Sequence, residues 1–180
     1  MGFDTILATG ISVLVLMVLA YVLFAGFTGS IDQMTNTLKD VETMKGDQMK
    51  TSISVYNVST NDTVVTFEMS NNGFTKISNF SQMDVIMTFN QTFHQYADDP
   101  MSNQSLTIWF PYQENLTGDE DAWTCVNITP DMINPRVWDP GETLSCKMYI
   151  KETLQPGSLG WVVATAPNGV SGMGYFRVKI

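Results

Sequence analysis

The feature that most constrains this chain is an uninterrupted apolar run near its N-terminus. Residues 6–27 read ILATGISVLVLMVLAYVLFAGF, and no charged residue occurs between Asp4 and Asp32. At about 1.5 Å per residue this run makes a helix roughly 33 Å long, enough to cross the ~30 Å hydrocarbon core of a bilayer. We therefore predict a transmembrane helix over residues 6–27, preceded by a short tail at residues 1–5.

A cleaved secretory signal is the competing interpretation of this segment. Such a signal has a basic n-region, a shorter apolar core and a cleavage site of small residues. Here the tail at residues 1–5 carries no Lys or Arg, and the apolar run is longer than a signal core. The sequence therefore favours an uncleaved, single-pass helix that contacts membrane lipid.

Charge and composition exclude several classes of function. The 180 residues include 9 Lys+Arg and 18 Asp+Glu, a formal net charge of −9. Without a basic patch, binding of nucleic acid by phosphate neutralisation is disfavoured. The one histidine, His94, rules out multi-histidine metal sites and most histidine-dependent catalysis. Acidic residues at 98–99 and 118–121 carry oxygens that suit Ca²⁺, but solvated loops are the favoured interpretation. We expect no enzyme activity, cofactor or metal.

The segment after the apolar run, residues 28–50, has a helical pattern. The residues that lie along one helix stripe, spaced 3-4-3, are Ile31, Met34, Leu38 and Val41. We predict a helical stalk that Gly46 ends. Because an isolated exposed helix of this length is marginally stable, the stripe should pack on a sister helix or on the chain's own folded domain.

From residue 51 onward the hydrophobic period changes to two, the period of a half-buried strand. Eight short segments alternate in this way: residues 52–58, 63–69, 83–90, 106–110, 122–128, 143–150, 160–165 and 174–180. Turn signals separate them, at residues 71–73, 98–100, 139–141, 156–157 and 168–169. The pattern predicts an all-β, immunoglobulin-like antiparallel sandwich over residues 51–180, which is long enough to bury a core of its own.

The alternation also predicts which side chains form the core. The predicted core residues are Val55, Val65, Phe67, Val85, Met87, Phe89, Ile108, Ile128, Leu144, Met148 and Val163. The four tryptophans, which belong either to the core or to a partner surface, are Trp109, Trp123, Trp138 and Trp161.

Glycosylation signals indicate which side of the membrane the sandwich occupies. Twelve Asn and 33 Ser or Thr among 180 residues would give about two Asn-x-Ser/Thr triplets by chance, yet the chain has seven. All follow the apolar run: Asn57, Asn61, Asn79, Asn90, Asn103, Asn115 and Asn127. Such a surface is typical of a glycoprotein domain outside the cytoplasm, which places the N-terminus inside. A purely compositional origin is the alternative, since these residues also favour loops.

The two cysteines agree with an oxidising compartment. Cys125 and Cys146 each lie in a predicted strand. In an extracytoplasmic domain such a pair is predicted to form a disulfide, which would close a loop of about 20 residues and contribute on the order of 3 kcal/mol to the free energy of unfolding. Two buried free thiols are the alternative.

Several segments carry a resemblance to one protein family. They are Met1-Gly2-Phe3, residues 52–77, residues 83–89, Pro140-Gly141-Glu142 and the ending ATAPNGVSGMGYF at 164–176. In these segments the chain resembles the F-type accessory or stator (FlaF-like) family of the archaellum, the archaeal flagellum. The family's x-N-x-G turn corresponds to residues 71–73, and its TPNGV hairpin carries an inserted Ala before Pro167 here. Residues 91–136 resemble an enlarged insertion.

The resemblance implies a non-enzymatic stator. A sandwich held outside the cell membrane would bind the surface layer and fix the static part of the motility motor. The expected partners are surface-layer protein, a companion archaellum accessory protein of G type, and further copies of this chain as a homo-oligomer. The candidate contact surface consists of the acidic residues Asp119, Glu120 and Asp121.

A second interpretation is a subunit of an archaellum or type IV pilus-like filament, with residues 6–27 in the filament core. Small residues of the apolar run would allow close helix packing: Ala8, Gly10, Ser12, Ala20, Ala25 and Gly26. Against it, no basic leader precedes Gly2. A membrane-anchored enzyme or solute-binding protein is a third, weaker interpretation, because no site for it is recognisable.

The excess of sequons leads to a direct prediction. In its native host, protein purified from membranes should carry glycan on at least some of the seven asparagines, because a domain outside the cytoplasm meets the glycosylation machinery. Mass spectrometry of proteolytic peptides checks this. Seven unmodified asparagines would leave composition as the explanation of the excess.

Overall fold

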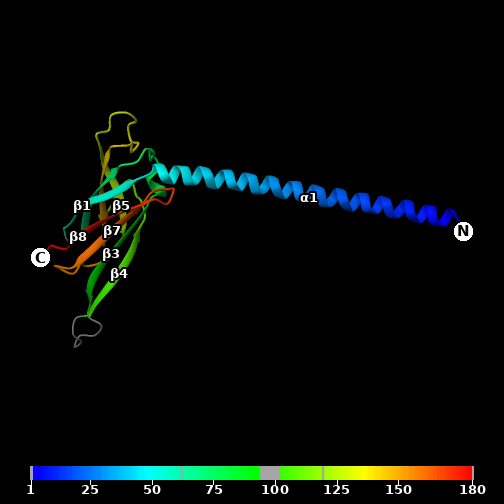
Figure 1. The fold of residues 1–180 in the computed structure, drawn as a ribbon. Coiled ribbons are helices and arrows are strands. Elements are labelled where there is room, and N and C mark those ends of the chain that lie inside the picture. The colour runs from blue at the N-terminus through cyan, green and yellow to red at the C-terminus, as the bar shows by residue number, and fades with distance from the viewer. Residues whose placement is uncertain (1, 62, 94–101, 119, 180) are drawn as a thin grey trace. The chain divides into compact units, whose positions relative to one another are not determined.

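The computed structural model describes residues 2–61, 63–93, 102–118 and 120–179. The chain divides into two compact units, Met1–Lys45 and Gly46–Ile180. In the described residues one long helix precedes eight strands and a 3-10 turn (Figure 1). The elements are α1 Phe3–Lys50, β1 Ile53–Asn61, β2 Val64–Asn71, η1 Phe80–Gln82, β3 Asp84–Phe93, β4 Ser102–Phe110, β5 Ala122–Thr129, β6 Thr143–Tyr149, β7 Leu159–Thr165 and β8 Ser171–Arg177.

Helix α1 is continuous over 48 residues. The segments predicted as a membrane helix and as a stalk are therefore parts of one helix. The prediction that Gly46 ends it is wrong, because the helix runs on to Lys50. Glycine inside a helix costs only about 1 kcal/mol relative to alanine. The final turn is also held by Gln48, whose Nε2 donates to the Asn168 carbonyl at 2.8 Å.

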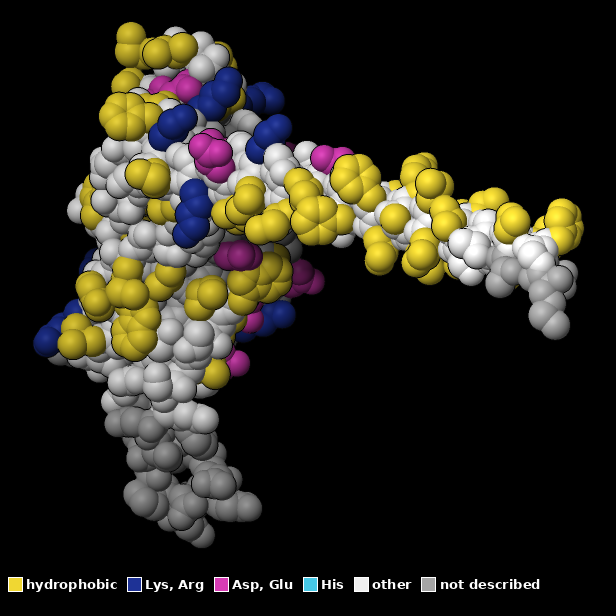
Figure 2. Space-filling view, turned by 45° about the vertical axis from the view of Figure 1, so that its right-hand side comes forward, with side chains coloured by type: hydrophobic (Ala, Val, Ile, Leu, Met, Phe, Trp, Pro, Cys, Tyr) yellow, Lys and Arg dark blue, Asp and Glu magenta, His cyan; other side chains and the backbone are white. Residues whose placement is uncertain are grey.

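Several hydroxyl side chains of the helix bond back to its own carbonyls. The hydroxyls of Ser12, Thr28 and Ser30 donate to the carbonyls of Ala8, Phe24 and Gly26, each at 2.9–3.1 Å. Such back-bonding pairs these three hydroxyls without water, as an apolar environment requires. By length and composition the described helix is able to cross a membrane, and none of its most apolar stretch is buried. In Figure 2 hydrophobic side chains cover the visible side of its N-terminal part.

The strands form two four-stranded antiparallel sheets, which confirms the predicted sandwich. Sheet I has the order β1-β2-β6-β5, and sheet II has the order β4-β3-β7-β8. Burial alternates along β2, β6 and β8, so every second side chain of these strands points inward. Consecutive strands β2 and β3 lie in different sheets, so the chain crosses between the layers after Asn71.

The core between the sheets contains most of the predicted residues. Nine of them are less than 9% exposed: Val55, Val65, Phe67, Val85, Met87, Phe89, Ile128, Leu144 and Met148. Ile108 is partly buried and packs against this core. Trp123 and Trp138 are fully buried, whereas Trp109 and Trp161 are exposed.

Val163 is the core prediction that is wrong. In β7 the inward residues are Gly160, Val162 and Ala164, so Val163 points outward. The ring of Phe176 explains the register, because a Cβ on Gly160 would lie 2.4 Å from it. Glycine at that position lets the aromatic ring fill the core beside β7. The run GWVVAT has apolar residues on both faces of the strand, so the sequence pattern did not show which face points inward.

The predicted turn at residues 71–73 is where the chain leaves sheet I, and its first residue is buried. Asn71 is fully buried, and its Nδ2 donates to the carbonyls of Thr75 (2.8 Å) and Trp138 (3.2 Å). Its Oδ1 accepts from the Gly73 backbone N–H at 3.2 Å. Gly73 has no room for a side chain, because a Cβ there would lie 2.5 Å from the Lys50 carbonyl oxygen. The amide of Asn71 thus fixes where the chain leaves sheet I.

Adjacent asparagines offer a matched test of this crossing. Asn71→Ala should lower the free energy of unfolding by about 2–4 kcal/mol, because it removes three hydrogen bonds of a fully buried amide. Asn72→Ala removes two exposed hydrogen bonds, one donated to Ser54 Oγ and one accepted from Ser70 Oγ, both at 2.8 Å, and should cost only about 1 kcal/mol. Denaturant unfolding of both variants measures the difference. Equal losses would show that the buried amide does not fix the crossing.

Candidate interaction surfaces

The predicted acidic contact surface is only partly described. Asp119 lies outside the described residues. Glu120 is exposed and accepts a hydrogen bond from Gln113 Nε2 at 3.2 Å. The Asp121 carboxylate accepts from the Lys151 backbone N–H at 2.8 Å and so holds its loop to the chain that follows β6. Asp121 therefore has a structural role, and Glu120 is the described member available to a partner.

The sequon asparagines lie mostly on accessible positions. Five are exposed: Asn57, Asn61, Asn79, Asn115 and Asn127. Asn90 is half-buried, and the side chain of Asn103 lies outside the described residues. Asn57 occupies a bulge between β1 and β2 with φ of +51° and donates its Nδ2 to Glu68 Oε2 at 2.7 Å. The sites for the predicted glycans are thus sterically accessible at these five positions.

The most buried carboxylates among the described residues hold a turn together. Within the described ranges no group of three or more His, Cys, Asp or Glu residues could hold a metal ion, and His94 lies outside them. The most buried acids, Asp139 and Glu142, belong to one turn: Glu142 Oε2 accepts from the Asp139 N–H at 2.9 Å. Asn134 Nδ2 in turn donates to the Asp139 carboxylate at 2.9–3.1 Å. These carboxylates shape a loop.

The two cysteines are direct cross-strand neighbours. Cys125 of β5 pairs in register with Cys146 of β6, so both side chains leave the sheet on the same face. Both are free thiols in the structure, one partly buried and the other buried. Burial raises the pKa of Cys125 to about 11 and raises the pKa of Cys146 well above its usual range. The disulfide stays a prediction.

The outer face of sheet II is apolar, a feature that the sequence pattern did not single out. Cross-strand pairing places Trp109, Ile86, Val163 and Met173 in one row across β4, β3, β7 and β8. The next row contains Thr107, Thr88, Trp161 and Tyr175. Trp109 is 56% and Tyr175 72% exposed. In the sequence, this face is indicated only by residues 160–165 and 173–176, which are apolar at positions that point to both sides of the sheet.

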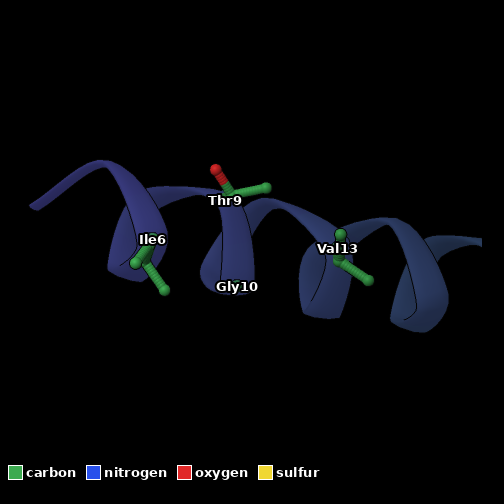
Figure 3. A pocket seen from close by; sticks show the side chains of 4 residues that line it. All are labelled: Ile6, Thr9, Gly10 and Val13. Carbon is green, nitrogen blue, oxygen red and sulfur yellow. The ribbon is translucent and has the colours of Figure 1, made fainter. Parts of the chain in front are cut away.

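A second apolar feature lies on the helix itself. Ile6, Thr9, Gly10 and Val13 line a shallow hollow on α1 (Figure 3). They are spaced i, i+3, i+4, i+7, so they share one side of the helix. Gly10 leaves the backbone bare between Ile6 and Val13, the arrangement that admits a second helix at close range.

Disulfide formation can be tested once the raised pKa of the thiols is taken into account. Because a pKa of about 11 leaves little thiolate at pH 8, alkylation of folded protein would be about 100-fold slower than at an ordinary thiol even without a disulfide. Protein isolated without reductant should therefore be alkylated in denaturant. We expect both cysteines to resist until reductant is added, and a linked Cys125–Cys146 peptide in a non-reducing digest. Full alkylation without reductant would contradict the pairing.

Comparison with known proteins finds one similar archaeal sequence and similar solved structures of archaeal proteins. No family model matches it. An uncharacterized protein of Archaeoglobus fulgidus is 25% identical over 182 residues, covering 99% of this chain and 98% of that protein. The structure of the archaeal flagellum of Methanospirillum hungatei strain JF1 matches with a TM-score of 0.51 at 11% identity, over 96% of this chain and 93% of that one.

The archaellum periplasmic stator protein FlaG from Sulfolobus acidocaldarius also resembles this chain. It matches with a TM-score of 0.46 at 19% identity, over 70% of this chain and 99% of that protein. Both of these solved structures are archaellum proteins. The whole-chain match to the Methanospirillum hungatei structure shows that this chain has the same fold, a long N-terminal helix followed by a β-sandwich.

Proposed function

We propose that this chain is a non-enzymatic, membrane-anchored component of an archaellum-type motility apparatus. In this role it is a stator that binds the surface layer and holds the motor static. The observation that carries the proposal is the joining of one fully exposed apolar helix to a separate compact sandwich. The resemblance of residues 52–77 and 164–176 to the FlaF-like family, and a fold shared with an archaeal flagellum protein, support it.

The proposed topology follows from the helix and the sequons. Residues 6–27 cross the cell membrane once, the N-terminus is cytoplasmic and the sandwich lies outside. Five exposed sequon asparagines in the sandwich support this orientation. The sandwich would then meet surface-layer protein and a companion accessory protein of G type. Force on the motor would pass through covalent chain from the membrane helix to the sandwich.

Binding to the surface layer is testable with the sandwich alone. A fragment starting at Gly46 is the suitable one, because Asp47 and Gln48 both contact Asn168. A start at Met49 would remove these contacts. We expect the fragment Gly46–Ile180 to remain soluble and to bind isolated surface-layer protein in a pull-down without added cofactor. Retention of surface-layer protein by an unrelated sandwich at the same level would contradict the proposal.

The acidic loop should set the rate of this binding. Asp119→Asn with Glu120→Gln removes two negative charges and leaves the Asp121 contact with Lys151 intact. Exposed rim charges act mainly on association, so the variant should associate several-fold more slowly with little change in dissociation, and added salt should reduce the difference. Surface plasmon resonance at two salt concentrations checks this. Asp131→Asn with Glu152→Gln is a matched control with the same change in net charge.

A filament subunit is the second candidate, favoured by the whole-chain match to the Methanospirillum hungatei flagellum and by the hollow at Gly10. Electron microscopy of native membranes and filaments separates the two roles. A single helix over residues 6–27 surrounded by lipid supports the stator. Helices packed repeatedly about a common axis would transfer the assignment to the filament.

A further inference from the structure

A hollow of about 560 Å³ lies where three parts of the sandwich meet. These parts are the end of β1 with the turn that follows it, the segment between β6 and β7, and the residues that follow β8. All of them belong to the compact unit Gly46–Ile180. A hollow of this size is in the range of pockets that hold small ligands.

Backbone hydrogen bonds hold the walls of this hollow in place. The Gln155 N–H donates to the Asn90 carbonyl at 3.1 Å, which ties the segment between β6 and β7 to β3. The Gly157 N–H donates to the Val178 carbonyl at 3.0 Å, which ties the same segment to the residues that follow β8. The hollow is therefore formed by the fold itself, so a ligand that enters it does not have to order these walls.

One polar group inside the hollow lacks a partner. Thr60 lines the hollow and is 2% exposed. Its Oγ1 is buried and makes no hydrogen bond with any residue that the structure describes. Buried hydroxyls are normally paired, because an unpaired one loses its bonds to water without replacement. The Thr60 hydroxyl therefore indicates that a polar group enters the hollow from outside the chain's own fold.

The remaining walls suit a sugar ring. Leu154 and Val178 provide buried apolar surface, and Thr153 and Lys179 add a hydroxyl and an ammonium group at exposed positions. Among the described residues that line the hollow there is no Asp or Glu, so it offers no carboxylate to a cation. A sugar has apolar C–H groups and hydroxyls that both donate and accept hydrogen bonds, which matches apolar walls with a few polar groups.

We propose that the hollow holds the first sugar of a glycan attached to Asn61, with a hydroxyl of that sugar paired to Thr60 Oγ1. Asn61 is exposed, ends β1 and itself lines the hollow. It also begins one of the seven sequons. Covalent attachment beside the hollow gives the sugar a high effective concentration, so even weak contacts keep it in place. The inference rests on the proposed position of the sandwich outside the cytoplasm.

A double-mutant cycle on the full-length chain tests the pairing. Thr60→Val removes the hydroxyl at nearly constant volume, and Asn61→Gln removes the glycan. Each protein is produced in the native host and solubilised from its membranes, and its unfolding in guanidinium is followed by tryptophan fluorescence. When Asn61 is glycosylated, Thr60→Val should shift the unfolding equilibrium about tenfold toward the unfolded state. With Asn61→Gln the same change should cause no loss, because the hydroxyl then has no sugar to pair with.

Three controls assign the effect to this glycan. Asn115→Gln removes another exposed sequon and should leave the tenfold effect of Thr60→Val intact. Thr60→Ser keeps the hydroxyl and should lose much less stability than Thr60→Val in the glycosylated chain. Full-length chain produced in a bacterial host without N-glycosylation should behave like Asn61→Gln, which separates loss of the glycan from the change of side chain.

Peptide mass spectrometry of the same samples distinguishes the ways in which the inference could fail. Glycan on other sequons but not on Asn61 would overturn the inference and leave the proposed topology supported. Seven unmodified asparagines would overturn the inference and also remove that support for the topology. An equal effect of Thr60→Val with and without the Asn61 glycan would show that the hydroxyl pairs with water in the hollow, and this too would overturn the inference.

Discussion

The exposed apolar surface of α1 is the constraint on which the rest of the molecule depends. Fifteen large apolar side chains between residues 6 and 27 are each at least 47% exposed. At about 1.5–3 kcal/mol for each such side chain, leaving them in water would cost more than the ~5–15 kcal/mol that keeps a domain folded. The segment must therefore be covered by lipid or by other helices. Both proposed roles meet this requirement. They differ in what covers the helix, which is lipid in a stator and other helices in a filament.

The sandwich is a separate unit that buries its own core, and its two outer faces differ in chemistry. Sheet I faces outward with polar residues and carries three exposed sequons, whereas sheet II faces outward with tryptophan, methionine and tyrosine. A domain that only had to stay soluble would not need an apolar outer face such as that of sheet II. Its neutrality, within a chain of net charge −9, allows close approach of another molecule that the rest of the surface would repel.

Sequence periodicity predicted the helix, the strands and nine of eleven core residues as buried, because alternation reports burial directly when one face is polar. It failed at Val163, where both faces of β7 are apolar and the register depends on the distant ring of Phe176. The crossing at Asn71 was likewise read as a simple turn, because its partners Thr75 and Trp138 come together only in the fold. The apolar outer face of sheet II required strand order, which no local pattern contains. The acidic loop was predictable as a charge cluster, but the structural use of Asp121 was not.

The surroundings of residues 6–27 also separate the stator from the filament. A single helix in a stator meets lipid on every side, and lipid does not require small residues on one side of the helix. In a filament neighbouring helices approach closely, and Gly10 between Ile6 and Val13 leaves room for that approach. The sandwich fits either role, because it is a separate unit that buries its own core. The choice between the two roles therefore rests on the helix.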